Sequence, residues 1–414
     1  MVKNKTVNYI TRNFGKYDIN SIESYEKIGG FSALKKAITM DGHDIASVLS
    51  LCKIKGRGGA AYDMGKKWHQ AKDISSPNKI VVCNADEGEP CTFKDRTLIE
   101  KDPFRLIEAM IIAGYSVDAE NGYIYLREEY SHLRPLLKSA IAQSEKKGYL
   151  GKNILGTNFS YYIHLHSGAG AYVCGEGTAL VESIEGKSGR PRMKPPFIKQ
   201  CGLFNLPTLV NNVESLSLVP SILLDDSKEY LTYGTESSVG TKLISVAGNV
   251  NNPGVFEIPF GLTLREIIYD LAGGVVNNNN IRLLQLGGAS GKIAPPKVLD
   301  IPYTYDDLRK VGLTIGSGAI LVVDTRTTLM EFLKSTQEFF SHESCGQCTP
   351  CREGNLHISL ILDKCIAGTA TKRDIETMEK IAKTMSISSL CGLGETAQSA
   401  LLSAMHWFKT DFEF

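Results

Sequence analysis

The sequence lacks the features that mark a membrane-spanning or secreted protein. It contains no run of about eighteen or more apolar residues, which a membrane-spanning helix requires. It begins MVKNKTVNYI and so lacks the apolar stretch of a signal peptide. Neither sign of charge is in excess, since 46 Lys and Arg residues and 45 Asp and Glu residues leave a formal net charge of +1. We therefore expect a cytoplasmic protein without direct membrane insertion that does not bind nucleic acid.

The chain also lacks the dense cysteine pattern of a small disulfide-stapled scaffold. Its ten cysteines are spread over 414 residues, which fits a reducing compartment. The composition, 43% apolar and 22% charged, is that of an ordinary soluble globular protein. The length predicts two to four domains with a sizeable core.

Four of the cysteines do form a pattern. The segment E-S-C-G-Q-C-T-P-C-R-E-G places Cys345, Cys348 and Cys351 three residues apart, and Cys391 follows as a remote single cysteine. Crowded thiolates repel one another unless a metal centre binds them. Iron–sulfur clusters take four Cys ligands, often from such a run plus a remote fourth, whereas structural zinc prefers two separated pairs. The spacing favours a [4Fe–4S] cluster, with zinc and metal-free thiols as the alternatives.

A glycine-rich stretch, I-K-G-R-G-G-A-A-Y-D-M-G-K-K-W, precedes the first clear strand. It contains G-x-G-x-x-A at Gly56, Gly58 and Ala61. An ordinary Rossmann turn needs a strand before this motif, and here the preceding segment has helical character. The glycines still expose backbone N–H groups that suit a phosphate, with charge added by Arg57 and Lys67. The alternative is a tight loop with solvated basic residues.

Polar or small residues follow two predicted strands. The apolar run from Ile80 to Cys83 ends in N-A-D-E-G-E-P, and carboxylates in such a loop can accept hydrogen bonds from ribose hydroxyls. The strand from Tyr161 to His166 leads into the segment S-G-A-G-A-Y-V-C-G, where a flat ring could approach the backbone. The pair Asn211 and Asn212 opens a predicted helix and either caps it or binds a polar cofactor edge.

The pattern of elements predicts an α/β protein of several parts. Strands alternate with helices over residues 51–235, which predicts a layered, Rossmann-like α/β domain. The order β-β-α-β-β in residues 240–325 then predicts a β-grasp domain. The C-terminal part has helical spacing and would form a helical bundle around the cysteine loop. We expect these divisions: 1–50, an N-terminal helical extension; 51–235, an α/β domain, to which the resemblance described below assigns FMN/NAD(H) binding; 240–325, a β-grasp domain; and 327–414, the bundle with the iron–sulfur site.

The sequence resembles a known family. G-R-G-G-A, N-A-D-E-G-E-P, F-K-D-R, G-A-G-A-Y-V-C-G-E, P-T-L-V-N-N-V-E and E-S-C-G-Q-C-T-P-C-R-E-G occur in that order. Together they resemble the NADH-binding flavoprotein (F) subunit of respiratory complex I and the beta subunits of NAD-linked hydrogenases and formate dehydrogenases, over roughly residues 50–414. The resemblance implies FMN, NAD(H) and a [4Fe–4S] cluster as cofactors, and a β-grasp domain like the soluble-ligand-binding (SLBB) type.

The resemblance also implies roles for individual residues. The implied FMN ligands are Gly56, Arg57, Gly58, Lys67, Asn84, Asp86, Tyr172, Gly175, Glu176, Asn211 and Asn212. NADH would stack over Gly59, Ala60 and Tyr62, with Glu87 and Glu89 near its ribose and carboxamide. Glu87 is expected to repel a 2′-phosphate. The cluster ligands would be Cys345, Cys348, Cys351 and Cys391.

The function that follows is that of a diaphorase subunit. It would exchange a hydride between NAD(H) and FMN and pass single electrons to a thioredoxin-like [2Fe–2S] subunit and a larger catalytic iron–sulfur subunit, in a hydrogenase, formate dehydrogenase or electron-bifurcating complex. The chain departs from the family, which usually has Gly-Phe-Pro-Thr where this chain has A-Y-D-M (61–64), glycine where it has Cys91, and glutamate where it has Gly177. A scaffold subunit with a degenerate nucleotide site and an NADP(H)-using variant are the alternatives.

Overall fold

A four-stranded parallel sheet organises the first part of the chain. The computed structural model describes residues 5–225 and 227–413. The strands lie in the order β3-β2-β1-β4, and all neighbours are parallel. Their bounds are β1 (Ile80–Ala85), β2 (Asn121–Leu126), β3 (Tyr162–Ser167) and β4 (Thr208–Asn212). Since the strands are parallel, the loops after all four gather at one edge of the sheet, where ligands bind in open α/β folds.

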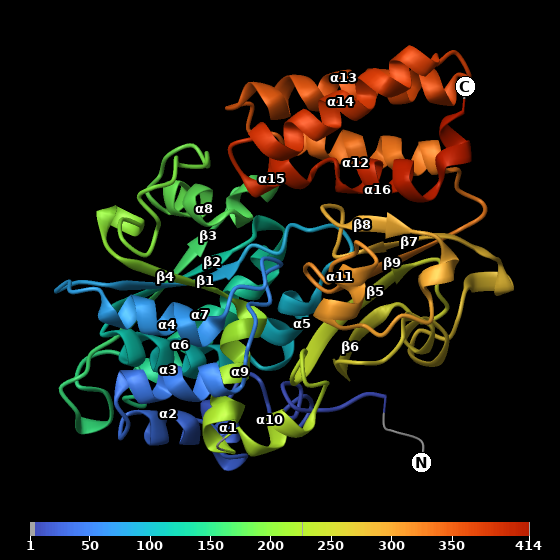
Figure 1. Ribbon diagram of the computed structural model, residues 1–414. Helices are drawn as coiled ribbons and strands as arrows, with labels where there is room; N and C mark the ends of the chain where they lie inside the picture. The colour runs from blue at the N-terminus through green and yellow to red at the C-terminus, as the bar shows by residue number, and fades with distance from the viewer. Residues whose placement is uncertain (1–4, 226, 414) are drawn as a thin grey trace.

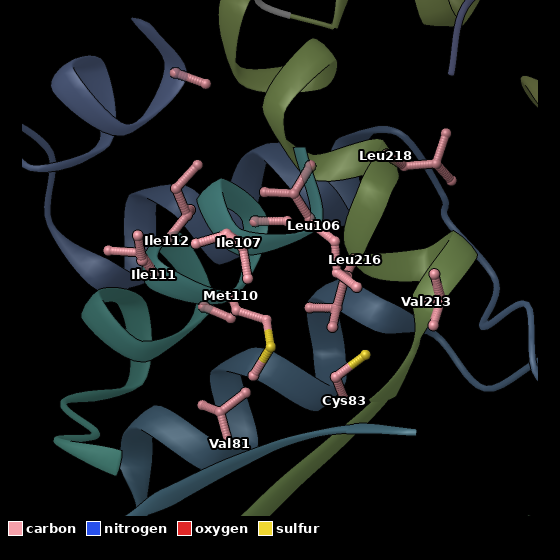
Figure 2. Close-up of a cluster of buried hydrophobic side chains, with 14 of the residues drawn as sticks. Val81, Cys83, Leu106, Ile107, Met110, Ile111, Ile112, Val213, Leu216 and Leu218 are labelled. Carbon is pink, nitrogen blue, oxygen red and sulfur yellow. The ribbon is translucent and has the colours of Figure 1, made fainter. Parts of the chain in front are cut away.

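The two faces of β1 belong to two different hydrophobic cores. Val81 and Cys83 pack with residues of α6 (Pro103–Val117) and α9 (Val213–Leu224), as Figure 2 shows. Ile80 and Val82 point to the opposite face and pack with α8 (Gly177–Ile184). This alternation follows from the two-residue period of a strand, and it explains why the run reads as continuously apolar.

Several further helices contribute residues to the core that α6 and α9 form with the sheet. Their bounds are α1 (Ile22–Lys27), α2 (Ser32–Ala37), α3 (Gly42–Leu51), α4 (Met64–Asp73), α5 (Lys94–Lys101), α7 (Arg134–Lys146) and α10 (Lys228–Thr232). Leu34 of α2 and Leu49 of α3 lie in the same core as Val81. The helical part of the first fifty residues therefore shares the core of the sheet, and its division from the following domain stays a prediction.

A second, five-stranded sheet follows. It has the order β6-β5-β9-β7-β8, formed by β5 (Thr241–Gly248), β6 (Gly254–Pro259), β7 (Ile281–Leu286), β8 (Lys292–Ala294) and β9 (Ala319–Asp324). The short strand β8 was not predicted. The predicted helix in this region is a single π-helical segment, Glu266–Leu271, with Ala272 N–H bonded to Ile267 O at 3.1 Å. A short helix, α11 (Tyr305–Lys310), precedes β9.

The C-terminal residues form a helical bundle that lies above both sheets in Figure 1. Its helices are α12 (Leu329–Glu343), α13 (Thr349–Ile366), α14 (Lys372–Ser388), α15 (Gly392–Thr396) and α16 (Ser399–Trp407). Capping boxes at Thr328 and Thr371 start α12 and α14, which explains why these helices begin where they do. In the part of the chain that the structure describes, no helix is long and apolar enough to cross a bilayer.

Candidate functional site

A cleft of about 510 Å³ lies where the two sheets and the helical bundle meet. The first domain contributes the glycine-rich loop, the loop after β1 and the 3-10 turn Tyr172–Gly175. The β-grasp domain contributes Ser290 and Ser317, and the bundle contributes Leu393. A second hollow of about 380 Å³ continues from it past Lys67, Asn211 and Asn212. The three parts of the chain therefore build one site together.

The glycine-rich loop places its backbone against this cleft. Gly56 N–H donates to Tyr62 O at 2.7 Å and closes the loop. Gly58, Gly59 and Ala60 line the cleft, and a Cβ added at Gly58 would lie 3.4 Å from Asn212 Cβ. These residues leave room for a ligand to approach the main chain closely.

Two of the family departures lie at left-handed positions. Ala61 has φ +53° and Cys91 has φ +65°, and the family usually has glycine where this chain has these two residues. A side chain in this region costs about 1–2 kcal/mol, so the usual glycine has a conformational reason. Tyr62, expected to stack on the dinucleotide, is 46% exposed, and its hydroxyl donates to Gln70 Oε1 at 3.2 Å.

The loop after β1 is joined to the Tyr172–Gly175 turn. Asn84 Nδ2 donates to Gly175 O at 2.9 Å, while Asn84 Oδ1 accepts from Asp86 N–H at 3.0 Å. Asp86 Oδ2 is buried without a hydrogen-bond partner among the described residues, and burial raises the pKa of this carboxyl to about 7. Asp86 also lines the cleft. Its carboxyl is thus available to a ligand as an acceptor or, when protonated, as a donor.

The far end of the site carries a lysine and an amide. Lys67 Nζ donates to Val210 O, and burial lowers the pKa of Lys67 to about 8. Asn211 Nδ2 is buried without a partner among the described residues. Asn212 caps α9, its Oδ1 accepting from Glu214 N–H at 3.0 Å. An unpaired amide donor, an unpaired carboxyl oxygen, a cation and a glycine-lined wall fit a planar group with polar edges and a phosphate, such as FMN.

The acidic residues of the site are held mainly by the protein itself. Glu87 accepts from Asp95 N–H at 2.9 Å and Arg96 N–H at 3.1 Å, so it caps the start of α5. Glu89 accepts from Tyr172 Oη at 2.6 Å and from Ser290 N–H at 2.7 Å. These contacts tie the loop after β1 to α5 and to the β-grasp domain. The contact of Glu87 and Glu89 with a dinucleotide stays a prediction.

Glu176 is the N-cap residue of α8, and its side chain also pairs with a lysine in an exposed loop. Its Oε2 accepts from Thr178 N–H at 2.8 Å and Ala179 N–H at 3.0 Å, and its Oε1 pairs with Lys194 at 2.6 Å. Gly177 follows directly, and a Cβ there would meet Ile198 Cδ1 at 3.1 Å. A glutamate at this position would therefore need the Ile198 side chain to move by a few tenths of an ångström.

The four predicted cysteines surround one cavity. Cys345 lies in the loop before α13, Cys348 is the N-cap of α13, Cys351 lies in its first turn, and Cys391 is the N-cap of α15. The left-handed Gly346 (φ +72°) allows the tight turn between the first two. Among the described residues, no three His, Cys, Asp or Glu side chains are placed to hold a single metal ion. Four cysteines around one cavity, three from a short run and one remote, match the ligand set of an iron–sulfur cluster.

Polar groups point at these sulfur atoms. Asn355 Nδ2 donates to Cys351 Sγ at 3.3 Å, and Leu390 N–H donates to Cys348 Sγ at 3.5 Å. Ser344 Oγ lies 3.3 Å from Cys351 Sγ. Donors of this kind stabilise thiolate ligands and tune the reduction potential of a cluster. The donor set therefore fits an iron–sulfur cluster.

Sequence reasoning missed a buried ionic network beside the cleft. Glu214 of α9 is paired with Lys242 Nζ at 2.6 Å and Lys94 Nζ at 3.1 Å, and all three side chains are at most 1% exposed. Burial opposes the ionisation of Glu214, but Lys242, Lys94 and Arg57 outweigh it and lower the pKa of this carboxyl to about 2. Lys94 and Glu214 lie in F-K-D-R and P-T-L-V-N-N-V-E, whereas nothing in the sequence singles out Lys242.

A parallel-sheet cleft beside a four-cysteine cavity defines an FMN- and iron–sulfur-dependent oxidoreductase subunit. The Nuo51 FMN-binding domain matches residues 49–221, the SLBB domain matches 243–294, and the NADH-ubiquinone oxidoreductase-F iron-sulfur binding region matches 331–414. The chain is 39% identical to the F 2 subunit of the NADH-quinone oxidoreductase of Rhizobium meliloti (strain 1021), over 97% of this chain and 96% of that protein. The chain belongs to the family of NADH-quinone oxidoreductase F subunits and related hydrogenase subunits.

Other relatives extend the comparison. The NADH-quinone oxidoreductase F subunit of Aquifex aeolicus (strain VF5) is 41% identical over 99% of this chain and 94% of its own length. The NADP-reducing hydrogenase subunit HndC of Solidesulfovibrio fructosivorans is 39% identical over 99% of this chain and 83% of its own length. A crystal structure of an NAD+-reducing [NiFe]-hydrogenase in the H2-reduced state matches with a TM-score of 0.84 at 34% identity over 91% of this chain, which spans 63% of that solved chain.

These findings confirm several predictions made from the sequence. The family, the α/β fold with an SLBB domain and C-terminal helices, and the FMN and [4Fe–4S] cofactors of an NADH-oxidising subunit are confirmed. The roles of individual residues stay predictions.

Proposed function

We propose that this chain is the electron-input subunit of a larger oxidoreductase. It would take a hydride from NADH at the cleft and deliver single electrons through the cysteine site to partner subunits, with the reverse direction open to the same site. The observation that carries the proposal is the shared wall between the two sites. Val173 and Leu393 line both the cleft and the cysteine cavity, so the two hollows are direct neighbours.

Each part of the cleft has a task in this proposal. FMN, when bound, supplies the exchange between two-electron and one-electron chemistry, and the protein supplies binding, orientation and electrostatics. The glycine-rich loop lets flat rings approach, while Asp86 in the cleft and Asn211 in the second hollow offer unpaired polar atoms to the ring edges. Lys67 offsets negative charge on the phosphate or on the reduced ring. Cys345, Cys348, Cys351 and Cys391 hold the cluster.

Partner subunits follow from the same proposal. A lone cluster close to a flavin must pass its electrons onward, and the relatives are themselves named as subunits of NADH-quinone oxidoreductases and of a hydrogenase. We expect a thioredoxin-like [2Fe–2S] subunit and a larger catalytic iron–sulfur subunit, assembled in the cytoplasm. Co-purification of the tagged chain from its host would identify both.

A second candidate is an NADP(H)-using subunit. One relative is named an NADP-reducing hydrogenase subunit, and Gly177 leaves the start of α8 without a second carboxylate. The cation of Lys194 lies next to this position, paired with Glu176 at 2.6 Å. A cation here and one carboxylate fewer would lower the electrostatic cost of binding a 2′-phosphate.

An anaerobic titration tests both candidates. The purified full chain, reconstituted with FMN and a cluster, is titrated with NADH and separately with NADPH, and the visible spectrum is recorded. Bleaching by NADH, with about four irons and four sulfides per chain as a [4Fe–4S] cluster requires, supports the proposal. Bleaching by NADPH alone supports the second candidate. If neither dinucleotide bleaches the bound flavin, the result contradicts the proposed enzymatic role and supports a scaffold subunit.

A further inference from the structure

Arg57, in the middle of the glycine-rich loop, lines both hollows of the site, but its guanidinium bonds to residues that lie outside them. Its Nη2 donates to Tyr230 Oη and to Thr241 O, both at 2.9 Å, and its Nη1 donates to Tyr305 Oη at 3.3 Å. The guanidinium also lies 5.2 Å from the centre of the Phe260 ring, and Arg57 is 1% exposed. Thr241, Phe260 and Tyr305 belong to the β-grasp region. The charge expected at a phosphate is thus used at a domain interface.

The main chain of Arg57 is fixed as well. Its N–H donates to Ser215 Oγ at 2.9 Å, and Ser215 lies in the first turn of α9. The flanking residues Gly56, Gly58 and Gly59 have no side chains with which to hold the loop. Glycine loses more conformational freedom on ordering than any other residue, so a loop of this composition needs an external anchor to keep one shape. Arg57 is the residue that provides this anchor.

A second set of contacts at the same interface fixes the start of α9, which faces the glycine-rich loop. Glu214, two residues after Asn212, accepts from Lys242 Nζ at 2.6 Å and from Leu243 N–H at 3.0 Å. Lys242 and Leu243 directly follow Thr241, which holds the Arg57 guanidinium. The first three residues of β5 therefore hold both the glycine-rich loop and the start of α9, the two elements that approach each other at Gly58 and Asn212.

We propose that the β-grasp domain is a positioning element of the flavin site, and that Arg57 is the positioning residue through which it holds the glycine-rich loop in its binding shape. This inference rests on the proposed function, because it concerns the affinity of the same cleft for FMN. It assigns the domain a task within this chain that needs no ligand of the domain's own. The hydroxyls of Tyr230 and Tyr305 act on FMN only through Arg57, since neither residue lines the cleft.

The test removes these hydroxyls and leaves the cleft intact. The full chain carrying Tyr230→Phe and Tyr305→Phe is compared with the unmodified chain for FMN dissociation constant, measured by quenching of flavin fluorescence. We expect binding at least tenfold weaker. Tyr303→Phe is the matched control, because Tyr303 is fully buried nearby and its hydroxyl has no partner among the described residues. The control should bind FMN as the unmodified chain does.

Repeating the comparison in an Arg57→Met chain separates positioning from general loss of stability. If the hydroxyls act through Arg57, their removal causes no further loss once Arg57 is gone. In the FMN-free chain, trypsin should also cleave after Lys55 faster in the double variant than in Tyr303→Phe. An affinity within twofold of the unmodified chain, an equal loss with and without Arg57, or equal cleavage rates would overturn the inference. An unmodified chain that fails to bind FMN would instead overturn the proposed function.

Discussion

Replacing Glu214 by glutamine tests the buried ionic network. The change removes the negative charge that faces Lys242, Lys94 and Arg57, and Glu214 and Lys242 are each at most 1% exposed. The cations hold the pKa of Glu214 at about 2 instead of 4.5, which at about 1.4 kcal/mol per pH unit corresponds to ~3 kcal/mol. Breaking a buried ion pair costs about 3–5 kcal/mol, so both arguments give a similar loss of unfolding free energy.

The pH dependence of this contribution has a defined sign. The folded pKa of Glu214 lies below the unfolded value, so its stabilisation is present above about pH 4.5 and is lost as the pH falls towards 2. The Glu214→Gln chain should therefore lose less stability between these pH values than the unmodified chain. Lys242 has a pKa lowered to about 7, first by burial and then by repulsion from Lys94 and Arg57. Its contribution makes stability rise with pH from about 7 towards 10.5.

Urea unfolding followed by tryptophan fluorescence measures the loss. The chain has two tryptophans, and Trp68 is buried in the core that contains α9, whereas Trp407 lies in α16. A Trp407→Phe background lets Trp68 report on the domain that holds Glu214. In this background Glu214→Gln should lower the unfolding free energy by about 3 kcal/mol.

Two further variants make the result specific. Adding Lys242→Met to Glu214→Gln removes a buried amino group that has lost its partner, and should restore part of the stability. Glu266→Gln is the control, because Glu266 pairs with Lys5 at the surface and should change stability by less than about 1 kcal/mol. A loss below about 1 kcal/mol for Glu214→Gln, or no recovery in the double variant, would refute the reasoning.

The remaining predictions concern the flavin loop, the phosphate cation and the cluster. FMN affinity should fall as the pH rises through about 8, where Lys67 loses its proton, and Lys67→Met should abolish this dependence in a fluorescence titration. Ala61→Gly should raise the unfolding free energy by up to about 1 kcal/mol, because Ala61 has the left-handed φ of +53°, whereas Ala60→Gly should lower it. A lower unfolding free energy for Ala61→Gly would contradict the backbone strain at this residue. Cys391→Ser should abolish the cluster absorption and lower the iron content, while Cys365→Ser, outside the cavity, should retain both.

Local patterns were sufficient wherever a feature is built from one segment. The continuous apolar run from Ile80 to Cys83 predicted β1, because burial on both faces of a strand selects apolar residues at successive positions. The helix predicted to open at about Asn211 begins at Val213, since β4 extends through Asn212 and Asn212 caps the helix. The predicted helix after Leu264 contains the π-helical segment Glu266–Leu271 and ends before the left-handed Gly273 and Gly274.

The sequence by itself singled out the four cysteines that surround one cavity and the glycines that line the cleft. Three of the four cysteines lie within one short turn, where spacing alone sets their geometry. Only the tertiary structure decided the direction of Arg57, whose motif suggested a phosphate but whose partners come from residues 230–305. It likewise decided that Glu89 bonds Ser290 and that Glu214 pairs with Lys242. The physical reason is that a buried charge must be paired or hydrogen-bonded, and the packing of the domains against one another decides which partner lies within reach.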